Sequence, residues 1–258
     1  MTDNRLASLF ERKERDILAV YFTAGYPRPD ITRDTILRLD AAGADLIEIG
    51  IPFSDPLADG PTIQASSKAA IEGGMTLARL FTQLTDIRTQ TQIPLVLMGY
   101  LNPVLRFGME NFCRRCQECG VDGVILPDMP LAFFLSRYQS MFRRHRINPV
   151  FLVTPQTTDE RVRALAAATG GFLYAVSMAT TTGGTAGLGP AQIAYFKRLT
   201  DLRLGKPILA GFGIADHASF RTACESLQGA VVGSAFIRAQ EMGVPPAEFV
   251  SRLRGAAG

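Results

Sequence analysis

The chain has 258 residues, of which 47% are apolar and 20% charged, proportions typical of a globular protein with a sizeable core. Its net charge of +3 comes without a broad basic face, which argues against nucleic-acid binding. The longest apolar stretches are about half as long as a membrane span, and the N-terminus lacks the apolar segment of a secretory signal. We therefore expect a cytoplasmic protein that neither crosses a membrane nor binds nucleic acid.

Short apolar runs alternate along the chain with longer amphipathic stretches. The runs are continuously apolar, as in a parallel sheet that is buried on both faces. They predict eight strands, at Ile17–Phe22, Leu46–Ile49, Pro94–Met98, Val121–Leu126, Pro149–Val153, Phe172–Val176, Pro207–Ala210 and Ala230–Val232. Apolar residues at helical spacing, with Asp, Thr, Pro or Gly at several ends, predict helices between them. These are Asp30–Ala42, Thr76–Thr91, Met109–Cys119, Leu131–Arg144, Asp159–Ala168, Pro190–Thr200 and Asp216–Leu227.

This alternation predicts an α/β protein: a (β/α)8 TIM barrel, a single domain over residues 1–258 with an extra N-terminal helix. One domain of this length is routine for the barrel, and no Pro- or Ser-rich linker divides the chain. Active-site residues of such barrels lie at the C-terminal ends of the strands and in the loops that follow. The residues after each apolar run are therefore the candidates for a site.

Three cysteines, Cys113, Cys116 and Cys119, have a spacing that a metal or iron–sulfur site could use. The same stretch also has the pattern of a helix that ends at Gly120, with Phe112, Cys116 and Cys119 on one buried stripe. Cysteine behaves as a small hydrophobic residue in such places. We interpret the three as core residues and expect no metal.

Glu48 is the one carboxylate within the apolar run at residues 46–49. A buried carboxylate without a partner costs several kcal/mol, so it raises its pKa or finds a partner. At a barrel mouth, a raised pKa suits acid–base catalysis. The alternative is a structural glutamate bonded to a backbone amide, and position alone does not separate the two. The long Pro- and Gly-rich loop that follows adds Asp55 and Asp59, each of which by itself is typical of a turn.

Glycine-rich segments follow the last three predicted strands: Thr182-Gly183-Gly184, Gly211-Phe212-Gly213 and Gly233-Ser234. The loops after strands 7 and 8, with a short helix N-terminus, form the recurrent phosphate site of this fold. Glycine there lets backbone amides approach an anion closely. Two such loops on neighbouring strands predict a phosphorylated substrate.

The residue types that are absent from the predicted mouth of the barrel exclude several classes of reaction. The chain has only four lysines, and none lies at the C-terminal end of a predicted strand, so Schiff-base aldol chemistry lacks its nucleophile. The two histidines, His145 and His217, fall in or beside predicted helices, which argues against a His-ligated catalytic metal. Acid–base chemistry without a cofactor on a phosphorylated substrate remains.

The segment IEIGIPFSDPLADGPTIQ, at residues 47–64, strongly resembles the signature of tryptophan synthase α subunits. Further matches are FTAGYP after strand 1, YLNP after strand 3, LPDMP after strand 4, AGFGI after strand 7 and VVGSA at strand 8. The first motif is highly specific and the others are individually modest. Together they extend the resemblance over nearly the whole chain.

The resemblance implies a carbon–carbon lyase of tryptophan biosynthesis, which cleaves indole-3-glycerol phosphate to indole and glyceraldehyde 3-phosphate by a retro-aldol reaction without a cofactor. Glu48 would be the general acid–base residue, moving a proton between the glycerol hydroxyl and indole C3. Asp59 would bind the indole nitrogen and stabilise the positive charge that forms there. Tyr174 matches a tyrosine close to the catalytic glutamate.

The resemblance also implies binding residues. Those of the substrate and its indole pocket are Tyr21, Met98, Tyr100, Ile125, Pro127 and Thr182. Those of the phosphate are Gly183, Gly211, Phe212, Gly213, Gly233 and Ser234. Asp55, Pro56, Asn102 and Pro103 match segments that face a β subunit, which holds pyridoxal phosphate and receives indole in an α2β2 tetramer.

The loop after strand 6 departs from the family pattern. Thr180 stands in place of a glycine and Thr181 in place of an apolar residue, and β-branched side chains tolerate positive φ poorly. Closure of the loop over the substrate, and coupling to a partner, could therefore differ from the family. Two alternatives stay open: a stand-alone lyase that releases free indole, and an α-like subunit that mainly activates a β subunit. The altered loop keeps the second open, while the presence of both Glu48 and Asp59 argues against it. A generic sugar-phosphate isomerase would leave the loop at residues 53–61 unexplained.

Overall fold

A closed barrel of eight parallel strands forms the centre of the protein, in a computed structural model that describes residues 4–57, 59–176 and 188–255. Each strand pairs with the next in the chain, and β8 pairs with β1. The strands are β1 Ile17–Thr23, β2 Leu46–Gly50, β3 Leu95–Met98, β4 Gly123–Ile125, β5 Asn148–Val153, β6 Leu173–Val176, β7 Ile208–Gly211 and β8 Gly229–Val232. The predicted (β/α)8 fold is confirmed, with each strand within about two residues of its predicted bounds.

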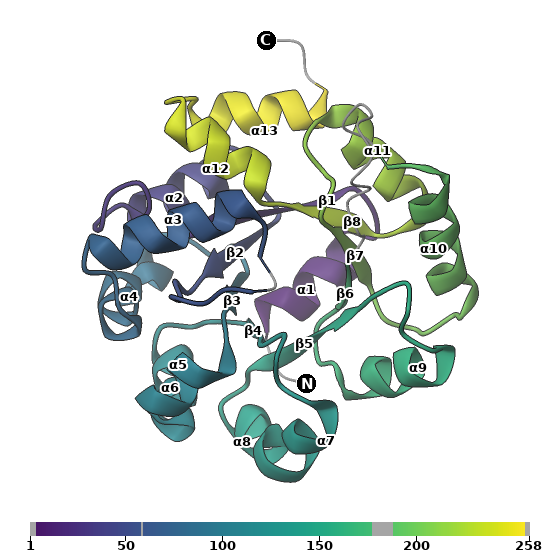
Figure 1. The fold of residues 1–258 in the computed structure, drawn as a ribbon, viewed down its shortest axis with the longest axis horizontal. Helices are drawn as coiled ribbons and strands as arrows, with labels where there is room; N and C mark the ends of the chain where they lie inside the picture. Colours follow the sequence, from purple (N-terminus) through teal and green to yellow (C-terminus); the bar gives the residue numbers. More distant parts are fainter. Residues whose placement is uncertain (1–3, 58, 177–187, 256–258) are drawn as a thin grey trace.

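Helices surround the ring of strands, and α1 lies across its centre (Figure 1). They are α1 Arg5–Arg12, α2 Thr32–Ala41, α3 Pro61–Glu72, α4 Leu77–Leu84, α5 Leu101–Phe107, α6 Met109–Glu118, α7 Leu131–Phe133, α8 Gln139–Arg144, α9 Asp159–Ala168, α10 Pro190–Asp201, α11 His217–Ser226, α12 Ser234–Glu241 and α13 Pro246–Arg254. A 3-10 turn, η1 Ile87–Thr89, and a π-helical turn, η2 Phe134–Tyr138, complete the set. Across the described ranges, no helix has the length and apolar character to cross a membrane.

Two of the predicted helices are interrupted. The helix predicted at residues 76–91 ends at Leu84, because Asp86 takes a left-handed conformation (φ 58°) before η1. The helix predicted at 131–144 contains the π-helical turn η2. Helices α3, α5, α12 and α13 have no counterpart among the predicted segments. The buried face of α3 consists of Ile63, Ser66, Ser67 and Ala70. Serines on the buried face remove the apolar periodicity by which a helix is recognised.

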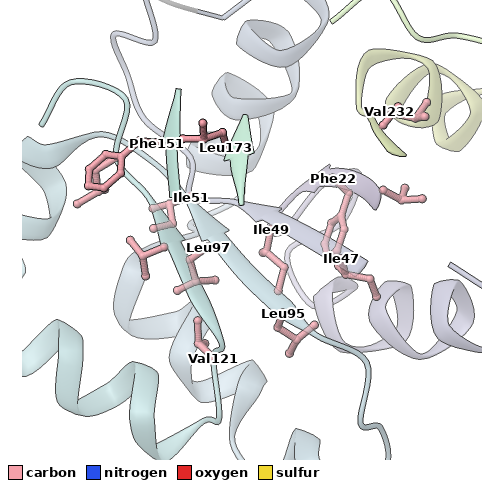
Figure 2. Packing of buried hydrophobic residues seen from close by; sticks show 14 of the residues in the cluster. Phe22, Ile47, Ile49, Ile51, Leu95, Leu97, Val121, Phe151, Leu173 and Val232 are labelled. Carbon is pink, nitrogen blue, oxygen red and sulfur yellow. The ribbon is translucent and has the colours of Figure 1, made fainter. Parts of the chain in front are cut away.

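The alternation of side chains along each strand divides the core into two layers. On β2, Ile47 and Ile49 point outward and pack with Leu95 and Leu97 of β3 beneath the surrounding helices (Figure 2). Leu46 belongs to the inner layer, which fills the barrel together with side chains of the other strands. Glu48 has the same parity as Leu46, so strand register directs its carboxyl into the barrel.

Helix α1, the extra N-terminal helix of the predicted fold, covers the N-terminal mouth of the barrel. Leu6 and Leu9 belong to the inner layer, and the Phe10 ring lies 5.9 Å from that of Phe172. Asn4 caps the helix by accepting from the Leu6 amide, and its amide group donates to two backbone carbonyls at the start of β4 and β5. The catalytic candidates therefore lie at the opposite mouth.

The three closely spaced cysteines lie on and at the end of α6, and all are buried. Burial raises the pKa of the Cys116 thiol well above its usual range. Cys119 follows the last residue of the helix, and its thiol donates to the Phe81 carbonyl at 3.6 Å. Such buried, neutral thiols agree with the interpretation of these residues as part of the core.

Candidate active site

Glu48 stands inside the barrel with a fully buried side chain. Neither of its carboxyl oxygens has a hydrogen-bond partner among the residues that the structure describes. Burial, and secondarily the charge of Asp59, raises the pKa of Glu48 to about 8. The structural alternative, a glutamate bonded to a backbone amide, is therefore not what the described residues show. At neutral pH the group carries its proton and is able to donate it.

Asp59 comes from the loop between β2 and α3. It lies close enough for its charge to raise the pKa of Glu48. Its Oδ2 accepts a hydrogen bond from the Tyr100 hydroxyl at 3.2 Å. The Tyr100 ring in turn packs on Phe53, with 5.0 Å between the ring centroids. Burial raises the pKa of Asp59, while the Tyr100 bond lowers it. A second carboxyl is thus held in a defined place beside the first.

Two tyrosines each lie across a glycine at the end of the adjacent strand: Tyr21 of β1 across Gly50 of β2, and Tyr174 of β6 across Gly211 of β7. A Cβ atom on Gly50 would stand 2.1 Å from the Tyr21 hydroxyl, and one on Gly211 would stand 1.9 Å from the Tyr174 ring. Only glycine permits these approaches. Burial raises the pKa of both tyrosines, and the nearby carboxyls Glu48 and Asp59 raise it further. Both phenols therefore remain protonated beside the two carboxyls.

A small pocket opens at this mouth. It is lined by Tyr21, Ile51, Phe53, Pro56, Asp59, Ser67, Met98, Gly99, Tyr100 and Pro127. The structure thus brings together four residues expected in the indole pocket with one expected catalytic residue. Ile125 belongs to the buried inner layer of the barrel and is not part of this lining.

Several lining residues were not among the sequence-based candidates. Ile51 and Phe53 lie in the same distinctive loop as Asp59. Their nearness to Asp59 in the sequence could have made them candidates. Ser67 lies on α3, a helix that apolar periodicity does not reveal. Gly99 follows β3, and a Cβ atom there would come within 2.9 Å of the Ile51 side chain.

The glycine-rich segments after β7 and β8 lie side by side, because these two strands pair. Phe212 and Gly213 both have positive φ, 71° and 76°, so the chain turns sharply after β7. Gly233 precedes α12 and Ser234 is its first residue, and the first amides of a helix have no partner within it. This is the arrangement expected of an anion site. Thr182 and Gly183, like Thr180 and Thr181, lie outside the described residues.

The residues expected to face a partner differ in exposure. Asp55 and Asn102 are exposed and Pro103 is half-buried, whereas Pro56 is buried and lines the pocket. Leu57, beside Pro56, is 92% exposed, and Leu105 on α5 is 44% exposed. Apolar side chains therefore reach the surface in both segments.

The fold and the site define a (β/α)8 barrel with a buried carboxyl of raised pKa inside it, a second carboxyl nearby and a small pocket at the C-terminal mouth. A family model described as tryptophan synthase alpha chain matches residues 7–251. The chain belongs to this family, a lyase family of tryptophan biosynthesis.

Individual relatives agree with the family model. The tryptophan synthase alpha chain of Bacteroides thetaiotaomicron is 46% identical over 98% of this chain and 99% of its own length. That of Christiangramia forsetii is 49% identical over 88% of this chain and 89% of its own. Among solved structures, the tryptophan synthase A-subunit from Pyrococcus furiosus has a TM-score of 0.84 at 35% identity, covering 93% of this chain and 99% of that one.

Proposed function

We propose that the chain cleaves indole-3-glycerol phosphate into indole and glyceraldehyde 3-phosphate without a cofactor, as a carbon–carbon lyase, with Glu48 as the acid–base residue. The observation that carries this proposal is the buried Glu48 carboxyl, whose oxygens have no partner in the described part of the chain and whose pKa is raised to about 8. Such a group holds a proton at neutral pH, and because the carboxylate left after proton transfer is poorly solvated, it readily takes a proton back.

Because Glu48 begins in its protonated form, the proposed reaction starts with a proton donated by Glu48. Glu48 first donates its proton to indole C3, which places positive charge on the ring nitrogen. The Glu48 carboxylate then takes the proton of the glycerol hydroxyl next to the bond that breaks. The oxygen electrons form the aldehyde, and the electrons of the carbon–carbon bond return to the ring to restore indole. Asp59 stabilises the transient cation through the ring N–H.

In the proposed pose, the indole ring and the phosphate of the substrate lie on different sides of the barrel mouth. Pro127, Met98 and Phe53 give the pocket apolar walls for a flat ring, next to the carboxyl of Asp59. The phosphate would lie on the amides of Gly211, Phe212, Gly213, Gly233 and Ser234, joined by Gly183. Tyr174 would pack beside the reacting carbons, because it lies across Gly211 near Glu48.

Replacement of Asp59 by asparagine is expected to lower kcat for indole release by the isolated chain about 10²-fold, because the neutral amide no longer stabilises the cation. Steady-state assays of indole formation measure this. Asp55→Asn, which changes an exposed carboxylate in the same loop, serves as the matched control and should leave kcat of the isolated chain unchanged. Retention of kcat within about threefold in Asp59→Asn would remove Asp59 from the mechanism.

The proposal includes a β subunit that binds pyridoxal phosphate and receives indole, in an α2β2 assembly in the cytoplasm. The exposed Leu57 and Leu105 support this, because they add apolar surface to the segments that hold Asp55, Pro56, Asn102 and Pro103. An apolar side chain that is 92% exposed beside a site loop suits a surface that another chain covers.

The deciding experiment measures indole release from indole-3-glycerol phosphate by the purified chain, alone and with a β subunit from a close relative. We expect weak release by the chain alone and strong stimulation by the β subunit. High release alone without stimulation would favour the stand-alone lyase. Absence of release in both conditions would leave the activator role.

A further inference from the structure

The loop that carries Asp59 is closed by a tight turn just before α3. The Asp59 amide donates to the Pro56 carbonyl at 3.0 Å, and the Leu57 amide donates to the Asp55 carbonyl at 2.9 Å. Gly60 precedes α3, and Pro61 is its first residue. These backbone contacts bend the chain at Asp59, but they do not attach the turn to the rest of the barrel.

Gln64, in the first turn of α3, attaches the backbone of this turn to the helix. Its Nε2 donates to the Asp59 carbonyl at 2.9 Å and lies 3.5 Å from the Pro56 carbonyl. A carboxamide nitrogen has two hydrogens, one for each of these acceptors. The side chain therefore joins the two ends of the turn, while the Asp59 carboxyl accepts from Tyr100.

Helix α3 is itself tied to the barrel. The hydroxyls of Ser66 and Thr23 of β1 are 2.7 Å apart, and both residues are fully buried. Ser66 also donates to the Ile63 carbonyl at 2.9 Å. The Thr23 hydroxyl is also hydrogen-bonded to the Tyr21 side chain. The Arg238 side chain of α12 adds a contact of 3.4 Å to the Thr62 hydroxyl.

We propose that Gln64 is a positioning residue for the proposed reaction: from a helix anchored on β1 by Thr23 and Ser66, it holds the backbone carbonyls of Pro56 and Asp59 and so places the Asp59 carboxyl. This inference rests on the proposed function, because it gives Gln64 a role only through Asp59. Gln64 itself is exposed and does not line the pocket, so it has no direct contact with the reacting atoms.

The size of the effect follows from the geometry that charge stabilisation requires. A carboxylate stabilises a developing cation fully only at hydrogen-bond distance, and a displacement of about 1 Å can cost about 10²-fold in rate. The turn keeps its own backbone bond when Gln64 is changed, so a smaller loss is expected, about tenfold in kcat. The apolar pocket walls remain, so KM should change less than about threefold.

The sharpest variant is Gln64→Met, which keeps the length of the side chain and its suitability for a helix but removes the donor. Gln90→Met is the control, because the Gln90 side chain is exposed and makes no hydrogen bond within the described part of the chain. Steady-state kinetics of indole release should show the tenfold loss of kcat for Gln64→Met alone, with unchanged thermal unfolding. In an Asp59→Asn background, Gln64→Met should cause no further loss.

A second pair of variants tests the anchor. Thr23→Val removes the hydroxyl at nearly constant size and should lower kcat, while Thr23→Ser keeps the hydroxyl and should restore it. Because Thr23 also bonds Tyr21, the valine variant is measured again in a Gln64→Met background, where the anchoring role predicts no further loss. The inference is overturned if Gln64→Met retains kcat within twofold, or if it lowers kcat by the same factor with and without Asp59. Equal rates for the valine and serine variants would overturn the anchoring role. Wild-type activity in Glu48→Gln would instead overturn the proposed function.

Discussion

Replacement of Glu48 by glutamine is expected to lower kcat for indole release by about 10³-fold. The amide has nearly the same shape and stays neutral, so the barrel interior is preserved, but it can neither donate a proton to C3 nor accept one from the hydroxyl. General acid–base groups contribute about 10²- to 10⁴-fold, and here a single group serves both steps. The assay follows indole at saturating substrate, with and without a β subunit.

Glu72→Gln provides the control, because Glu72 is an exposed glutamate on α3, 4.0 Å from Lys68. Its rate should equal that of the wild type. Circular dichroism would establish that both variants are folded. Indole release by Glu48→Gln within tenfold of the wild-type rate would mean that another group moves the proton, and the assignment of Glu48 would be wrong.

The same substitution is expected to stabilise the protein at alkaline pH. The pKa of Glu48 is about 8 in the folded protein and near 4.5 when the chain is unfolded, so the folded state holds the extra proton between these values. The stability associated with this proton is complete below about pH 4.5 and is lost as the pH rises toward 8. Each pH unit corresponds to about 1.4 kcal/mol for a full proton difference.

Between pH 5 and pH 8, wild type should therefore lose up to about 4 kcal/mol of unfolding free energy relative to Glu48→Gln. Urea unfolding at several pH values measures the difference. Asp59 also has a raised pKa, but both proteins carry it, and the neighbouring phenols Tyr21 and Tyr174 stay neutral in this range. A stability difference that is constant with pH would contradict the raised pKa of Glu48.

The local pattern of the sequence was sufficient for the fold. Strands such as Ile17–Phe22 and Leu46–Ile49 are recognisable because apolar runs and helical spacing are properties of neighbouring residues. The helix at 61–72 was missed because tertiary contacts, rather than apolar side chains, determine its buried face: Ser66 is buried through its hydrogen bond to Thr23. The interruption at Asp86 likewise depends on a backbone conformation that apolar spacing does not record.

The site divides in the same way. The sequence by itself determined the barrel and the family resemblance, and through that resemblance it made Glu48 and Asp59 candidates, because these inferences depend on the order of residue types along the chain. Only the tertiary structure decided that Glu48 has no hydrogen-bond partner in the described residues, that Tyr21 lies across Gly50 and that Gln64 holds the turn at Asp59. Each of these features depends on atoms that come from segments far apart in the sequence, and the pKa of Glu48 also depends on the exclusion of water. The local pattern of residue types does not contain this information.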